Sequence, residues 1–382
     1  MSNDLLSPSQ NILHRAEFKQ STLGIHISKN GITFCLHPAH QDVSYVYFDS
    51  KHGKYSKQQI LREMDDWNLM LQTYLPHINI LATTISFPGP IEGDSVEIPN
   101  WWSTGDNKFC KAEFSEFSFS KCQFEFINEI QAPGHGLIST DEFFGLEDDF
   151  IPLWKPPALE TMPTLYPLYF SSDAAAVLQV AYGLGAAFIV PIDSSDSYRV
   201  IASEWGHSLV QLCGPDEPNY DEELELIKFI GSKVGHAVEW EDICSSRGLI
   251  NCYEFAQHGI SDGQDVLALI EKDPNEPIAQ KALSIHFRFL MRFARMCAIS
   301  FTCKSLFITY GVFPGGVKAL QKHIPLCRDE FMHFTKSEWV SSVSVFVQTS
   351  DKNISALGVM YHAFLRLARS ESDEVNGDYG EE

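Results

Sequence analysis

Strand-like and helix-like segments alternate along most of this chain, and this alternation constrains the fold more than any other feature. Two apolar runs, Leu23–Ile27 and Ile32–Leu36, flank the segment Ser28–Gly31. An Asn-Gly step between such runs predicts a β-hairpin. Residues 56–75 place apolar side chains at helical spacing after a serine that can cap a helix, and a buried strand is predicted over 80–87. The pattern predicts an α/β fold with mixed sheets covered by helices.

The second half of the chain continues in the same way. A strand–turn–strand unit is predicted over 177–190, with Gly183-Leu184-Gly185 at its bend. Helices are predicted over 221–235 and 279–302, strands over 305–309 and 344–348, and a last helix over 354–367. The second of these helices is apolar nearly all round and should be buried. Five prolines in 150–170 indicate an irregular connection between two lobes.

The length of the chain allows two such lobes. It has 382 residues, of which 44% are apolar, so it can bury a large core. We expect a flexible N-terminal arm over 1–21, a small α/β domain formed by 22–136 together with 354–368, and a large α/β domain over 137–353. Residues 371–382 hold six acidic and no basic side chains, which predicts a disordered tail.

Composition excludes several classes of partner. A formal net charge of −22 argues against nucleic acid and against an anionic membrane surface. No uncharged apolar run is long enough to span a bilayer, and no secretory signal is visible at the N-terminus. The nine cysteines form no Cys-x-x-Cys pair, which is typical of reduced thiols in a cytoplasmic protein. We therefore expect a cytoplasmic protein with no metal site of its own.

Four short segments carry polar side chains beside turn residues. They are Pro99–Trp102, Ile127–Glu129, Ser203–His207 and Glu241–Asn251. Together they offer amides, carboxylates and an imidazole. Sugar hydroxyls both donate and accept hydrogen bonds, and such groups hold them in pairs. The pattern indicates a pocket for a polyhydroxylated ring.

The order and spacing of these segments resemble the bacterial-type glucokinases of the hexokinase/actin-like superfamily, from about residue 23 to 367. The resemblance implies a two-lobed hexokinase/actin-like (ribonuclease H-like) fold. It implies a sugar site formed by Asn100, Asn128, Glu204, His207 and Glu241. It also implies that Glu129 is the catalytic base, at a place where the family has an aspartate. The carboxylate of Glu129 lies one methylene further from the backbone than that of an aspartate.

The two glycine-rich phosphate turns of the family are altered here. The first normally reads Asp-x-Gly-Gly-Thr, and the matching segment His26–Asn30 lacks both glycines and the aspartate. Histidine is a poor partner for the hard Mg²⁺ ion. The second normally reads Gly-Thr-Gly-x-Gly, and here Tyr182 replaces the threonine. The nucleotide contacts implied by the resemblance are Ser28, Lys29, Asn30, Gly183, Gly185, Gly311 and Gly358.

The resemblance implies ATP-dependent phosphorylation of glucose to glucose 6-phosphate, with a weakened nucleotide site. The requirements would be ATP and Mg²⁺, the partner glucose or a related hexose, and the assembly a homodimer. A second interpretation is a catalytically inactive sugar-binding protein, or a structural subunit, with the same fold. The sequence alone leaves both interpretations open, because a fold does not guarantee an activity.

Overall fold

The computed structural model describes residues 13, 16–39, 46–98, 101, 105–154, 173–192, 197–259 and 264–377, with side chains through residue 369. Tertiary contacts divide the chain into two compact units. The first comprises Met1–Leu146 and Lys352–Glu382, and the second Glu147–Asp351. The division falls ten residues later than the predicted first boundary at 136, because helix α2 (Gln131–Phe143) packs within the first unit on helix α11 (Ile354–Gly377).

The main sheet of the first unit has the strand order β3-β2-β1-β4-β8. The strands are β1 (Gln20–Ser28), β2 (Gly31–Pro38), β3 (Tyr47–His52), β4 (Asn79–Phe87) and β8 (Gln123–Asn128). β1 pairs antiparallel with β2, which confirms the predicted hairpin, and β4 is parallel to both β1 and β8. The carboxyl ends of β1, β4 and β8 therefore lie at one edge of the sheet.

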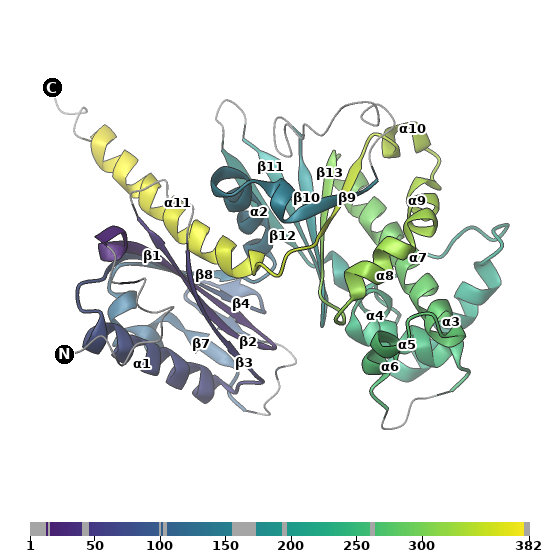
Figure 1. Ribbon diagram of the computed structural model, residues 1–382, viewed down its shortest axis with the longest axis horizontal. Helices are drawn as coiled ribbons and strands as arrows, with labels where there is room; N and C mark the ends of the chain where they lie inside the picture. The colour runs from purple at the N-terminus through teal and green to yellow at the C-terminus, as the bar shows by residue number, and fades with distance from the viewer. Residues whose placement is uncertain are drawn as a thin grey trace. The chain divides into compact units, whose positions relative to one another are not determined.

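Helices cover both faces of this sheet (Figure 1). Helix α1 (Lys57–Tyr74) begins at the predicted cap, where Ser56 accepts from the backbone of Gln59 and the Gln59 side chain accepts from the backbone of Ser56. Its Trp67 ring stacks on Phe34 at 4.6 Å between centroids. Helices α2 and α11 cover the opposite face and pack on each other. Both faces of the sheet are thus buried, as expected for parallel strands.

A smaller sheet extends the first unit. Its strands are β5 (Ile91–Glu92), β6 (Ser95–Glu97) and β7 (Lys108–Cys110), all antiparallel. A group of phenylalanines joins this small sheet to the end of β4, and Phe87 lies 4.9 Å from both Phe109 and Phe126 between ring centroids. Such aromatic pairs add to the stability that burial itself provides.

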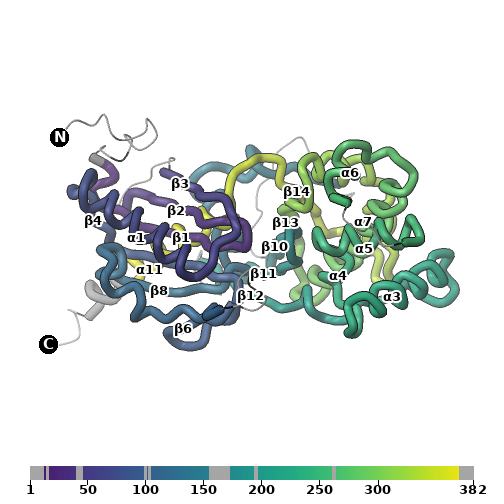
Figure 2. The backbone as a smooth tube through the Cα atoms, turned by 90° about the horizontal axis from the view of Figure 1, so that it is seen from below, coloured from purple at the N-terminus to yellow at the C-terminus, as the bar shows by residue number. Residues whose placement is uncertain are grey.

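The second unit is built on a six-stranded sheet with the order β12-β11-β10-β13-β14-β9. The strands are β9 (Phe150–Trp154), β10 (Ala175–Val180), β11 (Leu184–Pro191), β12 (Tyr198–Ser203), β13 (Ser305–Tyr310) and β14 (Ser344–Gln348). β10, β13 and β14 are parallel, and Figure 2 shows β10, β11 and β13 running side by side. The strands predicted over 177–190, 305–309 and 344–348 are confirmed.

Eight helices of the second unit lie in its described part. They are α3 (Tyr220–Val234), α4 (Glu241–Cys244), α5 (Ser246–Ala256), α6 (Val266–Lys272), α7 (Pro277–Ser300), α8 (Gly316–Lys322), α9 (Ile324–Met332) and α10 (Ser337–Val340). Helix α7 is buried along most of its length, as its composition predicts. It also buries Arg292, whose guanidinium donates to both carboxylate oxygens of Glu223 at 2.9 and 3.0 Å. This bidentate pairing makes a buried arginine tolerable.

The proline-rich connection is shorter than predicted at its start. Residues Phe150–Trp154 form strand β9, which pairs antiparallel with β14 at the edge of the sheet. Pro152 fits there because an edge strand does not need every backbone N–H for pairing. The prediction of irregular structure is therefore wrong for 150–154. Residues 155–170 lie outside the described residues.

The chain ends are also more ordered than predicted. Part of the expected arm, Ala16–Lys19, forms a short 3-10 helix, and Leu13 and Phe18 are fully buried. Burying two large apolar side chains outweighs the entropy of a loose arm there. Helix α11 continues to Gly377, into the predicted tail. Among the described residues, no helix combines the length and apolarity needed to cross a bilayer.

Candidate functional site

In the first unit, Asn128 and Glu129 lie at the carboxyl end of β8. Asn128 donates from Nδ2 to the carbonyl of Gly89 at 2.9 Å and accepts at Oδ1 from the backbone of Ile130 at 2.8 Å. The backbone N–H of Glu129 donates to the carbonyl of Phe87 at 2.8 Å. The loops after β4 and β8 are therefore fastened together, with Glu129 at the carboxyl edge of the sheet. The Asn128 amide that the resemblance assigns to the sugar also holds this turn.

The first predicted phosphate turn, Ser28–Asn30, follows β1 at the same edge. Ser28 Oγ accepts from the backbone N–H of Asn30 at 3.3 Å. This side-chain hydrogen bond stabilises a turn that contains no glycine at these three positions. His26 precedes it and is buried in the sheet, with Nδ1 2.8 Å from Ser86 Oγ. Burial lowers the pKa of His26 to about 4, so its imidazole is neutral. Mg²⁺ prefers oxygen ligands, so a histidine buried in the sheet is a poor replacement for the family's aspartate.

In the second unit, Glu204, His207 and Glu241 come together although Glu241 is far along the chain. Glu204 and His207 follow β12, and Glu241 begins helix α4. His207 Nδ1 lies 2.8 Å from Glu239 Oε2. Desolvation opposes the charged form of His207, but the hydrogen bond to Glu239 and the charges of Glu241 and Glu204 outweigh it and raise the pKa of His207. Glu239 is a site residue that the sequence motifs did not reveal.

The carboxylate of Glu241 also contacts the second predicted phosphate turn. Its Oε2 accepts from the backbone N–H of Leu184 at 3.1 Å, and its Oε1 lies 3.3 Å from Nη2 of Arg247. A Cβ placed on Gly183 would lie 2.8 Å from Oε2, so a larger residue there would displace the end of the Glu241 side chain. Arg247 also donates to the buried carboxylate of Asp242 at 3.1 Å. The sugar-side carboxylate and the glycine turn thus form one hydrogen-bonded group.

The same turn is tied to neighbouring loops on its other side. The carbonyl of Ala181 accepts from Ser246 twice, from the backbone N–H at 2.8 Å and from Oγ at 2.9 Å. The carbonyl of Val180 accepts from the backbone N–H of Gly311 at 2.7 Å. Tyr182, at the tip of the turn, is 41% exposed. These bonds hold Gly183 and Gly311, two predicted nucleotide contacts, in neighbouring loops of one unit.

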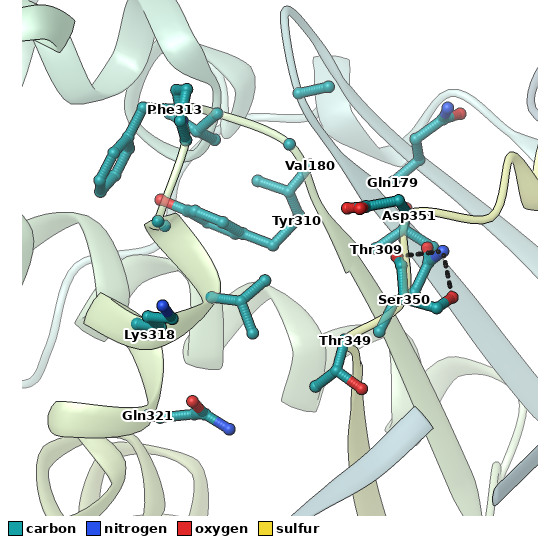
Figure 3. A pocket seen from close by; sticks show the side chains of 18 residues that line it. Gln179, Val180, Thr309, Tyr310, Phe313, Lys318, Gln321, Thr349, Ser350 and Asp351 are labelled. Carbon is teal, nitrogen blue, oxygen red and sulfur yellow. Dashed lines mark hydrogen bonds between the residues drawn. The ribbon is translucent and has the colours of Figure 1, made fainter. Parts of the chain in front are cut away.

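A pocket of about 710 Å³ opens at the carboxyl ends of β10, β13 and β14 (Figure 3). Tyr310, Gly311 and Phe313 form part of its wall, and Lys318 from α8 and Asp351 after β14 add charged groups. The ends of parallel strands are where α/β folds bind ligands. Aromatic and glycine-lined walls with a few polar groups suit a base, a ribose and their phosphates. This pocket is the candidate donor site.

The structure does not support a site role for two of the predicted residues, Gly358 and Asn100, and does not exclude one. Gly358 lies in α11, where a Cβ would sit 1.8 Å from the carbonyl of Ala132 in α2. Close helix packing therefore accounts for this glycine, and its nucleotide contact stays a prediction. Asn100 lies outside the described residues. Ser28 ends β1, Lys29 and Asn30 form the turn after it, Gly183 and Gly311 lie in loops, and Gly185 is the second residue of β11. Their nucleotide contacts stay predictions.

The chain is similar to known proteins in sequence and in fold. A family model described as Glucokinase matches residues 43–333. Glucokinase 1 of Trichomonas vaginalis is 28% identical over 357 residues, which cover 89% of this chain and 92% of the relative. The crystal structure of glucokinase from Balamuthia mandrillaris in complex with glucose superposes with a TM-score of 0.81 at 23% identity, covering 95% of this chain and 99% of that one.

Two further solved structures show the same fold. Leishmania braziliensis glucokinase has a TM-score of 0.71 at 16% identity, covering 94% of this chain and 98% of that one. A ROK family glucokinase from Streptomyces griseus, in complex with glucose and AMPPNP, has a TM-score of 0.57 at 14% identity, covering 90% and 99%. The predicted two-lobed hexokinase-like α/β fold is confirmed.

Proposed function

The chain belongs to the glucokinase family, and from this membership and the site geometry we propose that it transfers the terminal phosphoryl group of ATP to the 6-hydroxyl of glucose. One observation carries the proposal. Within one unit, Glu241 of the sugar cluster accepts from Leu184 of the glycine turn. Val180, at the start of that turn, accepts from the backbone N–H of Gly311, which lines the donor pocket. A sugar cluster and a nucleotide pocket in contact are what phosphoryl transfer to a sugar requires.

The proposed sugar residues would have the following roles. Glu204 and Glu241 accept hydrogen bonds from glucose hydroxyls, and the amides of Asn100 and Asn128 both donate and accept. His207 has its Nδ1 engaged by Glu239, which leaves Nε2 to donate to the sugar. Glu129 takes the proton from the 6-hydroxyl as it attacks. The acidity of a glutamate, about 4.3 against about 3.9 for aspartate, suits this role.

The donor would bind with its base and ribose in the pocket beside Gly311. The proposed phosphate contacts are Ser28, Lys29, Asn30, Gly183 and Gly185, and they would hold the phosphates less closely than two intact glycine turns would. This reduced contact is the proposed weakening of the nucleotide site. Phosphoryl transfer depends on positioning and on neutralising charge, so weaker contacts lower the rate without changing the chemistry.

Mg²⁺ supplies part of that charge neutralisation when it arrives with the nucleotide. Among the described residues, no group of three His, Cys, Asp or Glu side chains could hold a metal ion. His26, at the family's aspartate position, is buried and neutral. We therefore assign the metal no ligand at position 26 and expect the nucleotide phosphates to carry it.

The proposal extends to a related hexose as an alternative substrate, to a homodimer as the assembly and to the cytoplasm as the compartment. The alternative of a sugar-binding protein or structural subunit without catalysis has nothing in its favour among the comparisons.

A coupled assay tests the proposed function. Purified protein, glucose and Mg-ATP should give ADP at a rate that depends on glucose, together with glucose 6-phosphate as the product. Reactions without glucose measure background ATP hydrolysis, and mannose and fructose in its place measure the choice of hexose. Glucose binding by calorimetry without any ADP formation would contradict the proposal and favour a sugar-binding protein.

A further inference from the structure

Helix α4 carries Glu241, the proposed sugar ligand, but it is too short to be stable through its own hydrogen bonds. It spans four residues, Glu241–Cys244. A single turn leaves its carbonyl groups without helical partners, and an isolated turn is unstable. Side chains supply the missing donors in this structure. The contacts are Ser245 Oγ to the carbonyl of Glu241 at 2.7 Å, Asn251 Nδ2 to that of Asp242 at 2.9 Å and His286 Nδ1 to that of Ile243 at 2.7 Å.

His286 differs from the other two donors because it also bonds to the donor pocket. It lies on α7 and is fully buried. The carbonyl of Ile243 can only accept, so Nδ1 must carry the hydrogen and Nε2 must be the accepting nitrogen. Nε2 lies 3.0 Å from the hydroxyl of Tyr310, which therefore donates to it. Burial lowers the pKa of His286 to about 4, in agreement with a neutral ring in one tautomer.

Tyr310 is the last residue of β13, and it lines the donor pocket next to Gly311. A second connection runs parallel to the histidine. Ser246, the first residue of α5, donates to the carbonyl of Ala181 at 2.9 Å and to that of Val312 at 3.3 Å. Helix α4 is thus connected to the pocket wall through His286, and α5 is bonded to it directly through Ser246.

We propose that His286 is a positioning residue, whose bridge from Tyr310 to Ile243 holds α4 and so sets the Glu241 carboxylate for glucose. The inference rests on the proposed function, since it takes Glu241 as a sugar ligand. His286 is fully buried and does not line the donor pocket. It acts through the helix that it fastens.

Two substitutions of His286 distinguish the effect of its two hydrogen bonds from the effect of its buried volume. His286→Leu keeps apolar volume and removes both hydrogen bonds. His286→Asn keeps a donor near the Nδ1 position, which can still reach the carbonyl of Ile243. We expect His286→Leu to raise KM for glucose about tenfold, the ratio that matches the free-energy cost of leaving one buried carbonyl without its donor. His286→Asn should stay within about threefold of wild type. In both variants kcat and KM for ATP should change less than about threefold, because the lost contact positions a group that binds ground-state sugar.

His323→Leu is the matched control. The His323 ring packs against Phe287 at 5.2 Å between centroids, and its Nδ1 lies 2.8 Å from the carbonyl of Ala319 in the preceding helix α8. It makes neither bond of the bridge. This variant should lose thermal stability without a change in KM for glucose. An unchanged KM for glucose in folded His286→Leu, or an equal rise in His323→Leu, would overturn the inference.

Tyr310→Phe decides the matter if His286→Leu does not fold. It keeps the ring and removes only the donor to Nε2, and it should raise KM for glucose about threefold. A rise confined to KM for ATP would overturn the inference. If the wild type shows no turnover, only the proposed function is contradicted. Calorimetry then measures Kd for glucose, and the variants are compared with the wild type by Kd instead of KM. A wild type that binds no glucose overturns both.

Discussion

The imidazole of His207 lies among carboxylates that decide its protonation. Glu239 accepts from it directly, and Glu204 and Glu241 add negative charge nearby. The side chain of His207 is half exposed, so the ion pair with Glu239 contributes little to stability. Its effect is on function, because a histidine that keeps its proton to higher pH keeps a donor at both ring nitrogens.

Glu239→Gln should therefore change how glucose binding depends on pH. The raised pKa of His207 falls back toward about 6.5, so the variant loses the imidazole proton at lower pH than the wild type does. We expect the rise of KM for glucose on the alkaline side to begin at lower pH, measured from pH 6 to 9. Glu217→Gln is the control, because Glu217 pairs at 2.8 Å with His333 instead. Coinciding wild-type and Glu239→Gln profiles would refute this role for Glu239.

Two residues of the phosphate turns should limit ATP binding. Replacing Lys29 by glycine and Tyr182 by threonine together restores the smaller residues of the family's turns and removes a bulky, 41% exposed ring. We expect KM for ATP to fall severalfold, in steady-state kinetics at saturating glucose. Tyr74→Thr, which removes a 39% exposed tyrosine from α1, should leave it unchanged. If the double variant binds ATP no better, the turns are not what weakens the nucleotide site.

Sequence motifs predicted only part of the site at this scale. Glu204, His207 and Glu241 stand in recognisable segments, and the structure places them together. Glu239 and His286 carry no such signal, because their partners lie 32 and 43 residues away along the chain. A hydrogen bond between residues far apart in the chain produces no recognisable sequence pattern, whereas a turn motif has a fixed residue spacing.

At the scale of elements, the contact between α2 and α11 depends on glycines. A Cβ on Gly358 would meet the carbonyl of Ala132, and one on Gly136 would lie 2.0 Å from the carbonyl of Ile354. The helices can approach this closely only without side chains at those points. The strand and helix pattern was predictable because it is local. The crossing of α2 and α11 was not, since residues far apart in the sequence form it.

Gly358→Ala should therefore destabilise the fold. Overpacking of this kind costs roughly 1–3 kcal/mol, and thermal denaturation should show a lower Tm. Gly105→Ala is the matched control, because a Cβ there would meet no atom within 4 Å. An unchanged Tm combined with a higher KM for ATP would instead assign Gly358 to the nucleotide, as the family resemblance implies.

For the whole molecule, buried histidines predict sensitivity to acid. Burial lowers the pKa of His26 and of His286 to about 4. In the unfolded chain both take up protons near pH 6.5, so between about pH 6.5 and 4 the unfolded state binds more protons than the folded state. Stability should fall as the pH falls through this window, by up to about 1.4 kcal/mol per pH unit for each such histidine.

Urea denaturation from pH 7 to 4 measures this dependence. His286→Asn should have a shallower slope than the wild type, since it removes one of the groups that must stay neutral in the fold. His52→Asn, which replaces an exposed histidine, should keep the wild-type slope. Equal slopes in all three proteins would show that His286 is not held neutral.

We propose that this member of the glucokinase family is a working kinase with Glu129 as its base. The direct measurement is turnover and glucose affinity of Glu129→Gln beside the wild type. Removing a general base usually costs a factor of about 10² to 10⁴ in rate. We predict that kcat falls at least about a hundredfold while Kd for glucose, by calorimetry, stays within about threefold. Robust turnover that survives Glu129→Gln, or a wild type that binds glucose without turning it over, would contradict the account.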